Sequence, residues 1–264
     1  MAELLLLSNS TAPGRGFLEH ALGAITEVMH GRRRLLFVAL ASGDPDGYSQ
    51  LMRDCLARIG IRVECADAAG LRGPVAGAEA VFVGGGNSFR LLKRLTTLAV
   101  LGELRARVLD GVPYLGASVG ANLACATIRT TNDMPIVDPG SLQALGLVPF
   151  QVNVHYPDGE PAGPPGSETR QQRIAEFLEE NDVPVLGLRE GTWLRVSGRW
   201  PPSGGWPAAG SSGAAPDLRS VDGTFVWTPS HDQRPRSLST ALLRSWLRSP
   251  SARNRGPVRA PATN

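Results

Sequence analysis

Short apolar segments alternate with amphipathic segments along the first half of the chain. The apolar segments are almost uninterrupted, as in "LLLLS" at residues 4–8 and "EAVFVGGG" at residues 79–86. A strand covered on both faces has this kind of pattern. The amphipathic segments between them include residues 16–31, 48–60 and 87–111. Because strand and helix alternate, we expect an α/β fold with a mostly parallel central sheet and helices on both faces.

The spacing of apolar residues assigns one buried face to the helix expected at residues 48–60. Charged residues fall on the opposite side of that helix, as expected where a helix packs against a sheet. The residues predicted to face the core are Leu51, Cys55, Leu56 and Ile59.

The second half of the chain is less regular. We expect a helix at residues 167–182, opened by Ser167 as its N-cap. Residues 183–191 and 192–200 are predicted to form a strand pair, and residues 223–229 a last strand. The sheet is therefore expected to continue with mixed strand direction.

The length of 264 residues suits one domain followed by a tail. We expect a single catalytic α/β domain at residues 1–233, with a Gly/Pro/Ser-rich loop at residues 201–216, and a disordered tail at residues 234–264. The tail holds seven arginines and no acidic residue, whereas the rest of the chain holds 20 basic against 24 acidic residues. Nucleic-acid binding would have to come from the tail alone, and we expect none from the domain.

Several classes of protein are disfavoured by composition. No apolar run approaches the ~18 residues of a membrane span, and the N-terminus lacks the basic region of a secretory signal, so we expect a cytoplasmic protein without membrane contact. The odd number of cysteines, without close pairs, suits a reducing compartment. The four histidines are far apart, without an H-x-x-x-H pair, so no metal site is expected.

The first candidate for chemistry is "GASVG", Gly116 to Gly120, which lies between a predicted strand and a predicted helix. A sharp turn there would expose the hydroxyl of Ser118 and aim the first N–H groups of the helix at an oxyanion. The competing interpretation is a structural glycine turn. We interpret Ser118 as a nucleophile because of its place at a strand end.

A second glycine-rich turn, "VGGGNSF" at residues 83–89, also ends a predicted strand and opens a predicted helix. Three glycines allow the backbone to approach a ligand, and their N–H groups can serve as oxyanion donors. A phosphate loop is the alternative, although the Walker lysine and the G-x-G-x-x-G spacing are both missing. A plain tight turn is the third interpretation.

A nucleophilic serine needs a base, and His155 stands at the end of another apolar strand in "QVNVHYPDG". The base in turn needs a carboxylate that orients its ring. Asp133 in "TTNDMPIVDP" and Glu190 in "GLREGTW" both qualify, and the residues alone leave the choice open.

Longer blocks of the sequence resemble peptidase E, the α-aspartyl dipeptidase family of serine peptidases. The resemblance rests on "ELLLLSNST", "VGGGNSF", "GASVGANLACATIRTTNDMPIVDP", "NVHY", "GSETRQQRI" and "GLREGTWLRVSG", and it runs from the start to about Gly198. It implies a fold of the class I glutamine amidotransferase type, a cytoplasmic location, and hydrolysis of Asp-Xaa dipeptides without a cofactor. The expected partner is thus a small peptide substrate, and the expected assembly is a monomer or homodimer.

The resemblance also assigns roles at matching positions. Ser118 matches the family nucleophile and His155 the general base, while Asp133 and Glu190 both match positions that have been assigned as the third member. The roles implied for binding are oxyanion donation by the N–H groups of Gly86 and Val119, capture of the substrate's aspartyl side chain by Arg170, and substrate contact by Asn87.

One departure and three rival functions accompany this resemblance. Val119 stands where the family usually has alanine, so a branched side chain is expected to crowd the turn at the nucleophile and reduce activity. A cyanophycinase-like hydrolase would use the same parts on β-aspartyl-arginine bonds. A general α/β-hydrolase esterase is disfavoured because only 37 positions separate Ser118 from His155. This gap leaves little room for the strand–helix units that the α/β-hydrolase fold usually has between its serine and its histidine. A non-catalytic sensor or binding protein is the alternative from another class.

Overall fold

The computed structural model describes residues 2–66, 71–157 and 167–198, and the backbone of three short strands at 217–220, 224–227 and 236–237. The strands are β1 (Ala2–Leu7), β2 (Arg34–Val38), β3 (Arg62–Ala66), β4 (Val81–Val83), β5 (Tyr114–Ala117), β6 (Gln151–Tyr156), β7 (Val185–Arg189), β8 (Trp193–Gly198), β9 (Asp217–Ser220), β10 (Thr224–Trp227) and β11 (Arg236–Ser237). The helices are η1 (Glu19–Ala21), α1 (Leu22–Met29), α2 (Pro45–Ala57), α3 (Arg72–Gly77), α4 (Ser88–Thr97), α5 (Leu101–Leu109), α6 (Val119–Leu123) and α7 (Arg170–Glu180).

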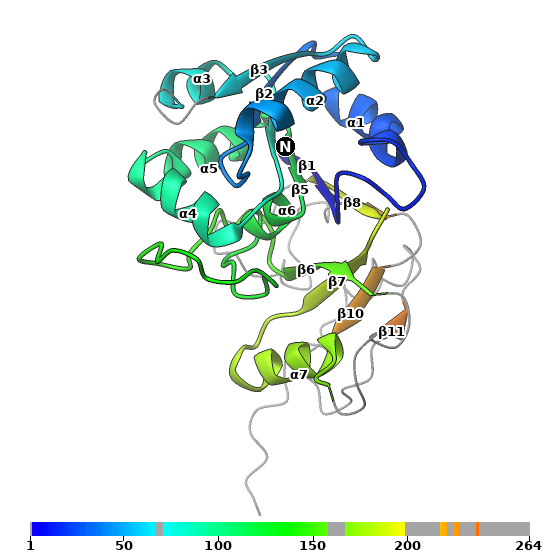
Figure 1. The fold of residues 1–264 in the computed structure, drawn as a ribbon, viewed down its shortest axis with the longest axis vertical. Coiled ribbons are helices and arrows are strands. Elements are labelled where there is room, and N and C mark those ends of the chain that lie inside the picture. The colour runs from blue at the N-terminus through cyan, green and yellow to red at the C-terminus, as the bar shows by residue number, and fades with distance from the viewer. Residues whose placement is uncertain are drawn as a thin grey trace, which may run out of the picture.

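Two sheets organise the described chain (Figure 1). The larger has the order β3-β2-β4-β5-β1-β8-β9, in which the first five strands are parallel and β8 runs antiparallel to β1. The smaller has the order β11-β10-β7-β6, with β6 and β7 parallel. The prediction of a mostly parallel central sheet is confirmed.

The expected pairing of residues 183–191 with residues 192–200 is wrong. β7 and β8 lie in different sheets, because β8 pairs with the whole length of β1 while β7 pairs with β6 and β10. A tight turn, in which the N–H of Thr192 donates to the carbonyl of Arg189 at 3.1 Å, carries the chain from one sheet to the other. The catalytic candidates lie around this crossing point.

Helices cover both faces of the larger sheet, as predicted (Figure 1). On one face, α1 and α2 pack on alternate residues of the central strands, such as Leu5, Phe37 and Phe82. On the other face, α3, α4 and α5 cover the intervening positions, such as Leu6 and Val83. The strands are apolar on both sides because both faces are buried.

Two details of the helices differ from the expectation. Cys55 and Leu56 are buried as predicted and Ile59 packs against the same cluster, but Leu51 is 53% exposed and Met52 is fully buried in its place. The N-cap of α7 is Thr169 and not Ser167, because the Thr169 hydroxyl and the Gln172 side chain form a reciprocal capping box.

The structure describes only short segments of the chain after residue 198. The strand predicted at residues 223–229 is present as β10, which pairs with β7. The two-residue strand β11 pairs with β10, and it falls within the segment expected to be a tail. The loop at residues 201–216 and residues 238–264 lie outside the described part of the chain.

Candidate active site

Ser118 occupies the sharp turn between β5 and α6. Its backbone has φ 54° and ψ −115°, a conformation that non-glycine residues rarely adopt. The flanking glycines have no room for a side chain: a Cβ on Gly116 would meet the backbone of Gly120, and a Cβ on Gly120 would meet the carbonyl of Val83. The G-x-S-x-G spacing is therefore required by the close packing of this turn.

His155 faces Ser118 from the smaller sheet. The Nε2 atom of His155 lies 2.8 Å from the Oγ atom of Ser118. His155 also has a positive φ of 54°, and the pairing of β6 with β7 shifts register between Asn153 and Tyr156. This irregularity bends the strand locally and changes the direction of the side chain, as β-bulges commonly do.

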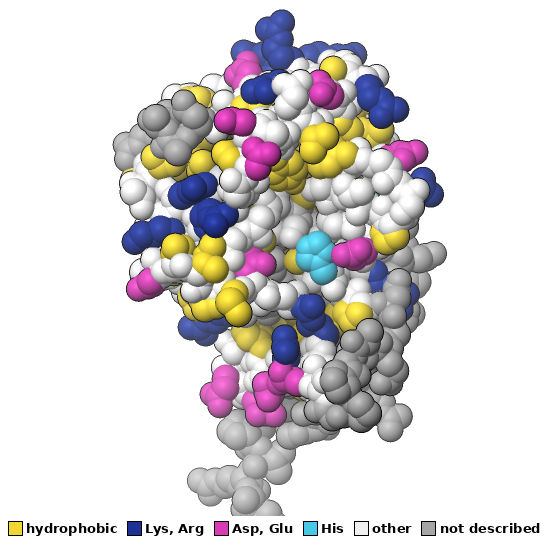
Figure 2. Space-filling model, viewed as in Figure 1, with side chains coloured by type: hydrophobic (Ala, Val, Ile, Leu, Met, Phe, Trp, Pro, Cys, Tyr) yellow, Lys and Arg dark blue, Asp and Glu magenta, His cyan; other side chains and the backbone are white. Residues whose placement is uncertain are grey.

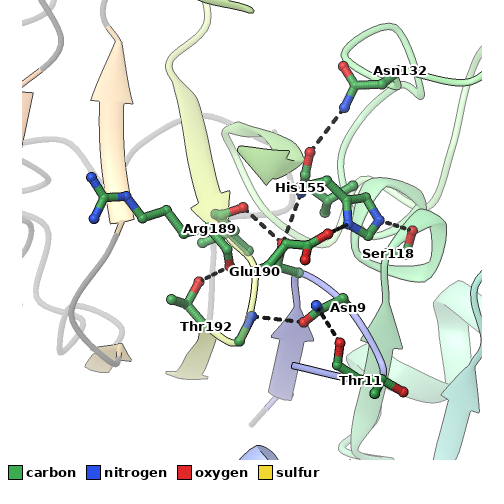
Figure 3. A network of polar contacts seen from close by, with 12 residues as sticks. Asn9, Thr11, Ser118, Asn132, His155, Arg189, Glu190 and Thr192 are labelled. Atoms are coloured by element: carbon green, nitrogen blue, oxygen red, sulfur yellow. Dashed lines mark hydrogen bonds and ion pairs between the residues drawn. The ribbon is translucent and has the colours of Figure 1, made fainter. Parts of the chain in front are cut away.

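Glu190 completes a chain of hydrogen bonds. Its Oε1 atom lies 3.1 Å from Nδ1 of His155, so the imidazole ring stands between the carboxylate and Ser118 (Figure 3). The side chains of His155 and Glu190 are 38% and 49% exposed. Figure 2 shows a histidine beside an acidic side chain at the margin of a hollow in the surface, which makes such a pair accessible to a substrate.

Asp133, the other candidate for orienting the base, makes different contacts. Its Oδ2 atom accepts hydrogen bonds from the backbone N–H of Ser88 at 2.6 Å and from the Ser88 hydroxyl at 2.5 Å. The hydroxyl of Ser88 also contacts Thr131 Oγ1 at 2.6 Å. Asp133 thus anchors its loop to the first turn of α4, next to the glycine-rich turn.

The glycine-rich turn after β4 lies against the nucleophile. A Cβ on Gly85 would be 3.4 Å from the Cβ of Ser118, and a Cβ on Gly86 would overlap the backbone of Ala41. Gly86 has φ 140°, which only glycine adopts without strain. Within the described residues, the backbone N–H groups of Gly86 and Val119 donate to no protein acceptor. Both N–H groups are therefore available to a ligand.

The side chain of Val119 is buried in the core. It is 2% exposed and belongs to the apolar cluster between the larger sheet and α3 to α6. Its backbone N–H belongs to the first turn of α6, where a helix leaves its N–H groups without internal partners.

Asn87 is engaged within the protein. Its Oδ1 atom caps α4 by accepting from the N–H of Arg90 at 3.1 Å, and its Nδ2 atom donates to the carbonyl of Met134 at 2.9 Å. In this arrangement Asn87 holds the loop that follows Asn132 against α4. A direct contact with substrate would require one of these bonds to open.

Arg170 is the first residue of α7 and is half-buried. Its Nη1 atom is buried and has no hydrogen-bond partner among the described residues. Burial, with the nearby charge of Arg173 as a second cause, lowers the pKa of Arg170. Tyr156, the neighbour of His155 in β6, lies close enough to interact electrostatically with Arg170. A buried donor without an acceptor is suited to an anionic ligand.

Two asparagines that the sequence reasoning missed support the strand that carries His155. The Nδ2 atom of Asn132 donates to the carbonyl of Val154 at 3.0 Å (Figure 3). Its Oδ1 atom accepts from the Nδ2 atom of Asn153 at 3.0 Å. Asn153 also donates to the carbonyl of Thr130 at 2.9 Å. The available signal was the presence of Gln151 and Asn153 in an otherwise apolar strand, because buried amides need partners.

The described residues contain no group of three or more histidine, cysteine or acidic side chains placed to hold a metal ion. Cys55 and Cys125 are buried and Cys65 is partly exposed, and all three are free thiols. In the part of the chain that the structure covers, every helix is too short or too polar to cross a bilayer.

A serine, a histidine and a carboxylate in one hydrogen-bonded chain at the edge of an α/β sheet define a serine hydrolase. Comparison with known proteins places the chain within that class. The model of peptidase family S51 matches residues 4–200. The chain is 54% identical over 198 residues to a protein named peptidase E from Streptomyces coelicolor, covering 74% of this chain and 81% of that one. The chain belongs to peptidase family S51 and is a serine peptidase.

Further relatives agree with this assignment. A peptidase E from Citrobacter koseri is 48% identical over 199 residues, covering 74% of this chain and 86% of that one. A Listeria monocytogenes protein with a known crystal structure superposes with a TM-score of 0.58 at 22% identity, covering 74% of this chain and 94% of that one. A peptidase from an acI-B1 actinobacterium gives a TM-score of 0.57 at 15% identity, covering 90% and 94%. These two structures support the fold.

Proposed function

We propose that this serine peptidase is a dipeptidase that hydrolyses Asp-Xaa through an acyl-enzyme on Ser118. The observation that carries the proposal is the hydrogen-bonded chain from Ser118 through His155 to Glu190, with contacts of 2.8 and 3.1 Å. His155 Nε2 takes the hydroxyl proton while Ser118 Oγ attacks the carbonyl carbon of the substrate. Glu190 holds the ring in the tautomer that leaves Nε2 free to accept this proton.

The negative charge that develops on the carbonyl oxygen needs hydrogen-bond donors. The N–H groups of Gly86 and Val119 take this role, because neither has a protein acceptor within the described residues. Val119 follows Ser118 in the chain, and Gly86 follows Gly85, where a Cβ would be 3.4 Å from the Cβ of Ser118. When the C–N bond breaks, His155 returns its proton to the leaving amine. Water activated by His155 then attacks the ester, which releases aspartate and restores the Ser118 hydroxyl.

Selection of an aspartyl side chain is assigned to Arg170. Its buried Nη1 atom has no acceptor within the described residues. Arg170 lies at the start of α7, where the positive end of the helix dipole also attracts an anionic side chain of the substrate. Tyr156 follows His155 directly in β6 and interacts electrostatically with Arg170, which supports a place for this guanidinium near His155. The relatives named peptidase E support the same class of reaction.

The test measures release of the free N-terminal amino acid from Asp-Leu by wild-type and Ser118→Ala protein. Asn-Leu, Glu-Leu and a β-aspartyl-arginine peptide are assayed alongside. Release from Asp-Leu that requires Ser118 would support the proposal. Preference for the β-linked peptide would instead indicate a cyanophycinase-like hydrolase. No release from any peptide, together with no labelling of Ser118 by a fluorophosphonate, would favour a non-catalytic sensor.

A further inference from the structure

We propose that residues 7–10, which are the last residue of the central strand β1 and the three residues after it, are a positioning segment that holds four separate parts of the catalytic machinery in register. The inference rests on the proposed function, because it concerns residues that act through Ser118, His155 and Glu190. The segment belongs to the "ELLLLSNST" block, whose polar residues the proposed mechanism leaves without a role.

The nucleophile and the base are joined through the first two residues of this segment. The carbonyl of Leu7 accepts from the N–H of Ser118 at 3.0 Å. The hydroxyl of Ser8 accepts from the N–H of His155 at 2.9 Å and donates to the carbonyl of Leu188 at 2.8 Å. Ser8 is fully buried, so water cannot replace these bonds. It fixes the backbone of His155 at the point where φ is positive.

The turn that carries Glu190 is held by Asn9. Its Oδ1 atom accepts from the N–H of Gly191 at 2.9 Å, and its Nδ2 atom donates to the carbonyl of Thr11 at 2.8 Å (Figure 3). Asn9 is 6% exposed, so the turn has little freedom to move relative to β1. The Glu190 side chain is half-exposed and is not held by surrounding packing. The bond between Asn9 and the N–H of Gly191 therefore keeps the Glu190 carboxylate within reach of His155.

The glycine-rich turn is held through Ser10. The hydroxyl of Ser10 lies 2.8 Å from that of Tyr48, which accepts from the N–H of Gly85 at 3.0 Å. The Tyr48 ring is fixed edge-on between Phe17 and Phe37, with ring centroids 5.9 and 5.0 Å away. Gly85 directly precedes Gly86, so this chain of bonds sets the direction of the oxyanion donor.

The convergence is specific to the carboxyl end of β1. Three consecutive residues, Leu7, Ser8 and Asn9, contact Ser118, His155 and Gly191, and the fourth, Ser10, reaches the glycine-rich turn through Tyr48. At the amino end of the same strand, Glu3 accepts from the hydroxyl of Ser197 at 2.9 Å, a bond that ties β1 to β8 far from the site. Ser197 therefore provides a matched control within the same sheet.

The experiment compares Asn9→Ala, Asn9→Asp, Ser10→Ala and Tyr48→Phe with the control Ser197→Ala in the full-length protein. Three quantities are measured: kcat and KM for Asp-Leu, the rate of Ser118 labelling by a fluorophosphonate, and the low-field NMR resonance of the proton between His155 Nδ1 and Glu190. The labelling rate and the resonance do not depend on the identity of the substrate. Failure of the Asp-Leu assay in wild-type protein would thus count against the proposed substrate and leave this inference testable.

We expect Asn9→Ala to lower kcat and the labelling rate by about 10- to 100-fold and to weaken the His155 resonance, with KM nearly unchanged. Asn9→Asp keeps an acceptor for Gly191 and should restore most of both rates. Ser10→Ala and Tyr48→Phe should lower kcat and labelling while leaving the resonance intact, because they act on the oxyanion turn. If all of these variants match Ser197→Ala in every quantity, the inference is wrong, even if their melting temperatures fall.

Discussion

The Nε2 atom of His155 lies 2.8 Å from the Oγ atom of Ser118, and both residues hold a backbone φ of 54°. A non-glycine residue in such a region costs on the order of 1–3 kcal/mol unless its surroundings compensate. Here the surroundings are bonds to β1: the N–H of Ser118 donates to Leu7, and the N–H of His155 donates to Ser8. The strain is therefore located where the side chains of Ser118 and His155 meet.

Replacement of the two candidate carboxylates should separate their roles. Glu190→Gln removes the charge beside His155 and should lower kcat by about 100-fold or more, with little change in melting temperature. Asp133→Ala removes the acceptor at the start of α4 and should cost about 1 kcal/mol of stability, with a smaller effect on kcat. Steady-state kinetics and thermal unfolding of both variants test this. The reverse order of kcat losses would assign Asp133 as the orienter.

The carboxylate preference should depend on Arg170. We expect Arg170→Gln to raise KM for Asp-Leu by about 10- to 100-fold and to abolish the preference over Asn-Leu, because a charge-assisted bond is lost. Arg173→Gln is the matched control, since Arg173 is exposed and its Nε already pairs with Glu168 at 2.6 Å. Equal effects of the two substitutions on KM would show that general positive charge, rather than Arg170, selects the substrate.

Val119 should contribute to stability more than it limits activity. Its side chain is packed in the core, so Val119→Ala should destabilise the protein by about 2 kcal/mol through lost apolar burial. The position of its N–H is set by the backbone turn, and kcat should stay within about threefold of the wild-type value. Denaturant unfolding and kinetics measure the two effects. A large gain in kcat would support the view that the valine crowds the oxyanion site.

The order of elements was predictable because burial on both faces leaves a strong sequence pattern. Unbroken apolar strands such as β1 and β5 and the glycines around Ser118 indicated a parallel sheet with a nucleophile at its edge. On the buried face of α2, Cys55 and Leu56 were predicted correctly, but Leu51 was chosen where Met52 is buried, because both residues are apolar and only packing decides between them.

The second sheet and the choice of carboxylate could not be predicted from local pattern. Whether β8 pairs with β7 or with β1 depends on long-range contacts that leave no periodic signal. Likewise, Asp133 and Glu190 are equally acidic in sequence, and only the bulge near His155 and the turn after β7 determine which of them reaches the ring. The site is thus more a product of topology than of local sequence.

His20 should make the stability of the protein depend on pH. Both of its ring nitrogens are buried without a hydrogen-bond partner in the described residues, and burial first, then the charge of Arg15, lowers its pKa from 6.5. Well above pH 6.5, His20 is neutral in both the folded and the unfolded state, so its titration does not affect stability. As pH falls below 6.5, the unfolded chain takes up a proton before the folded one does, so stability decreases until the lower native pKa is reached.

Thermal unfolding of wild-type and His20→Gln protein between about pH 7.5 and 5 measures this contribution. The difference in melting temperature between the two proteins should change in favour of the variant as pH falls, because glutamine does not titrate. At the upper end of the range the difference should be constant, and it reports only packing and polar contacts. A difference that stays constant across the whole range would show that His20 binds a proton as readily in the folded protein as in the unfolded chain.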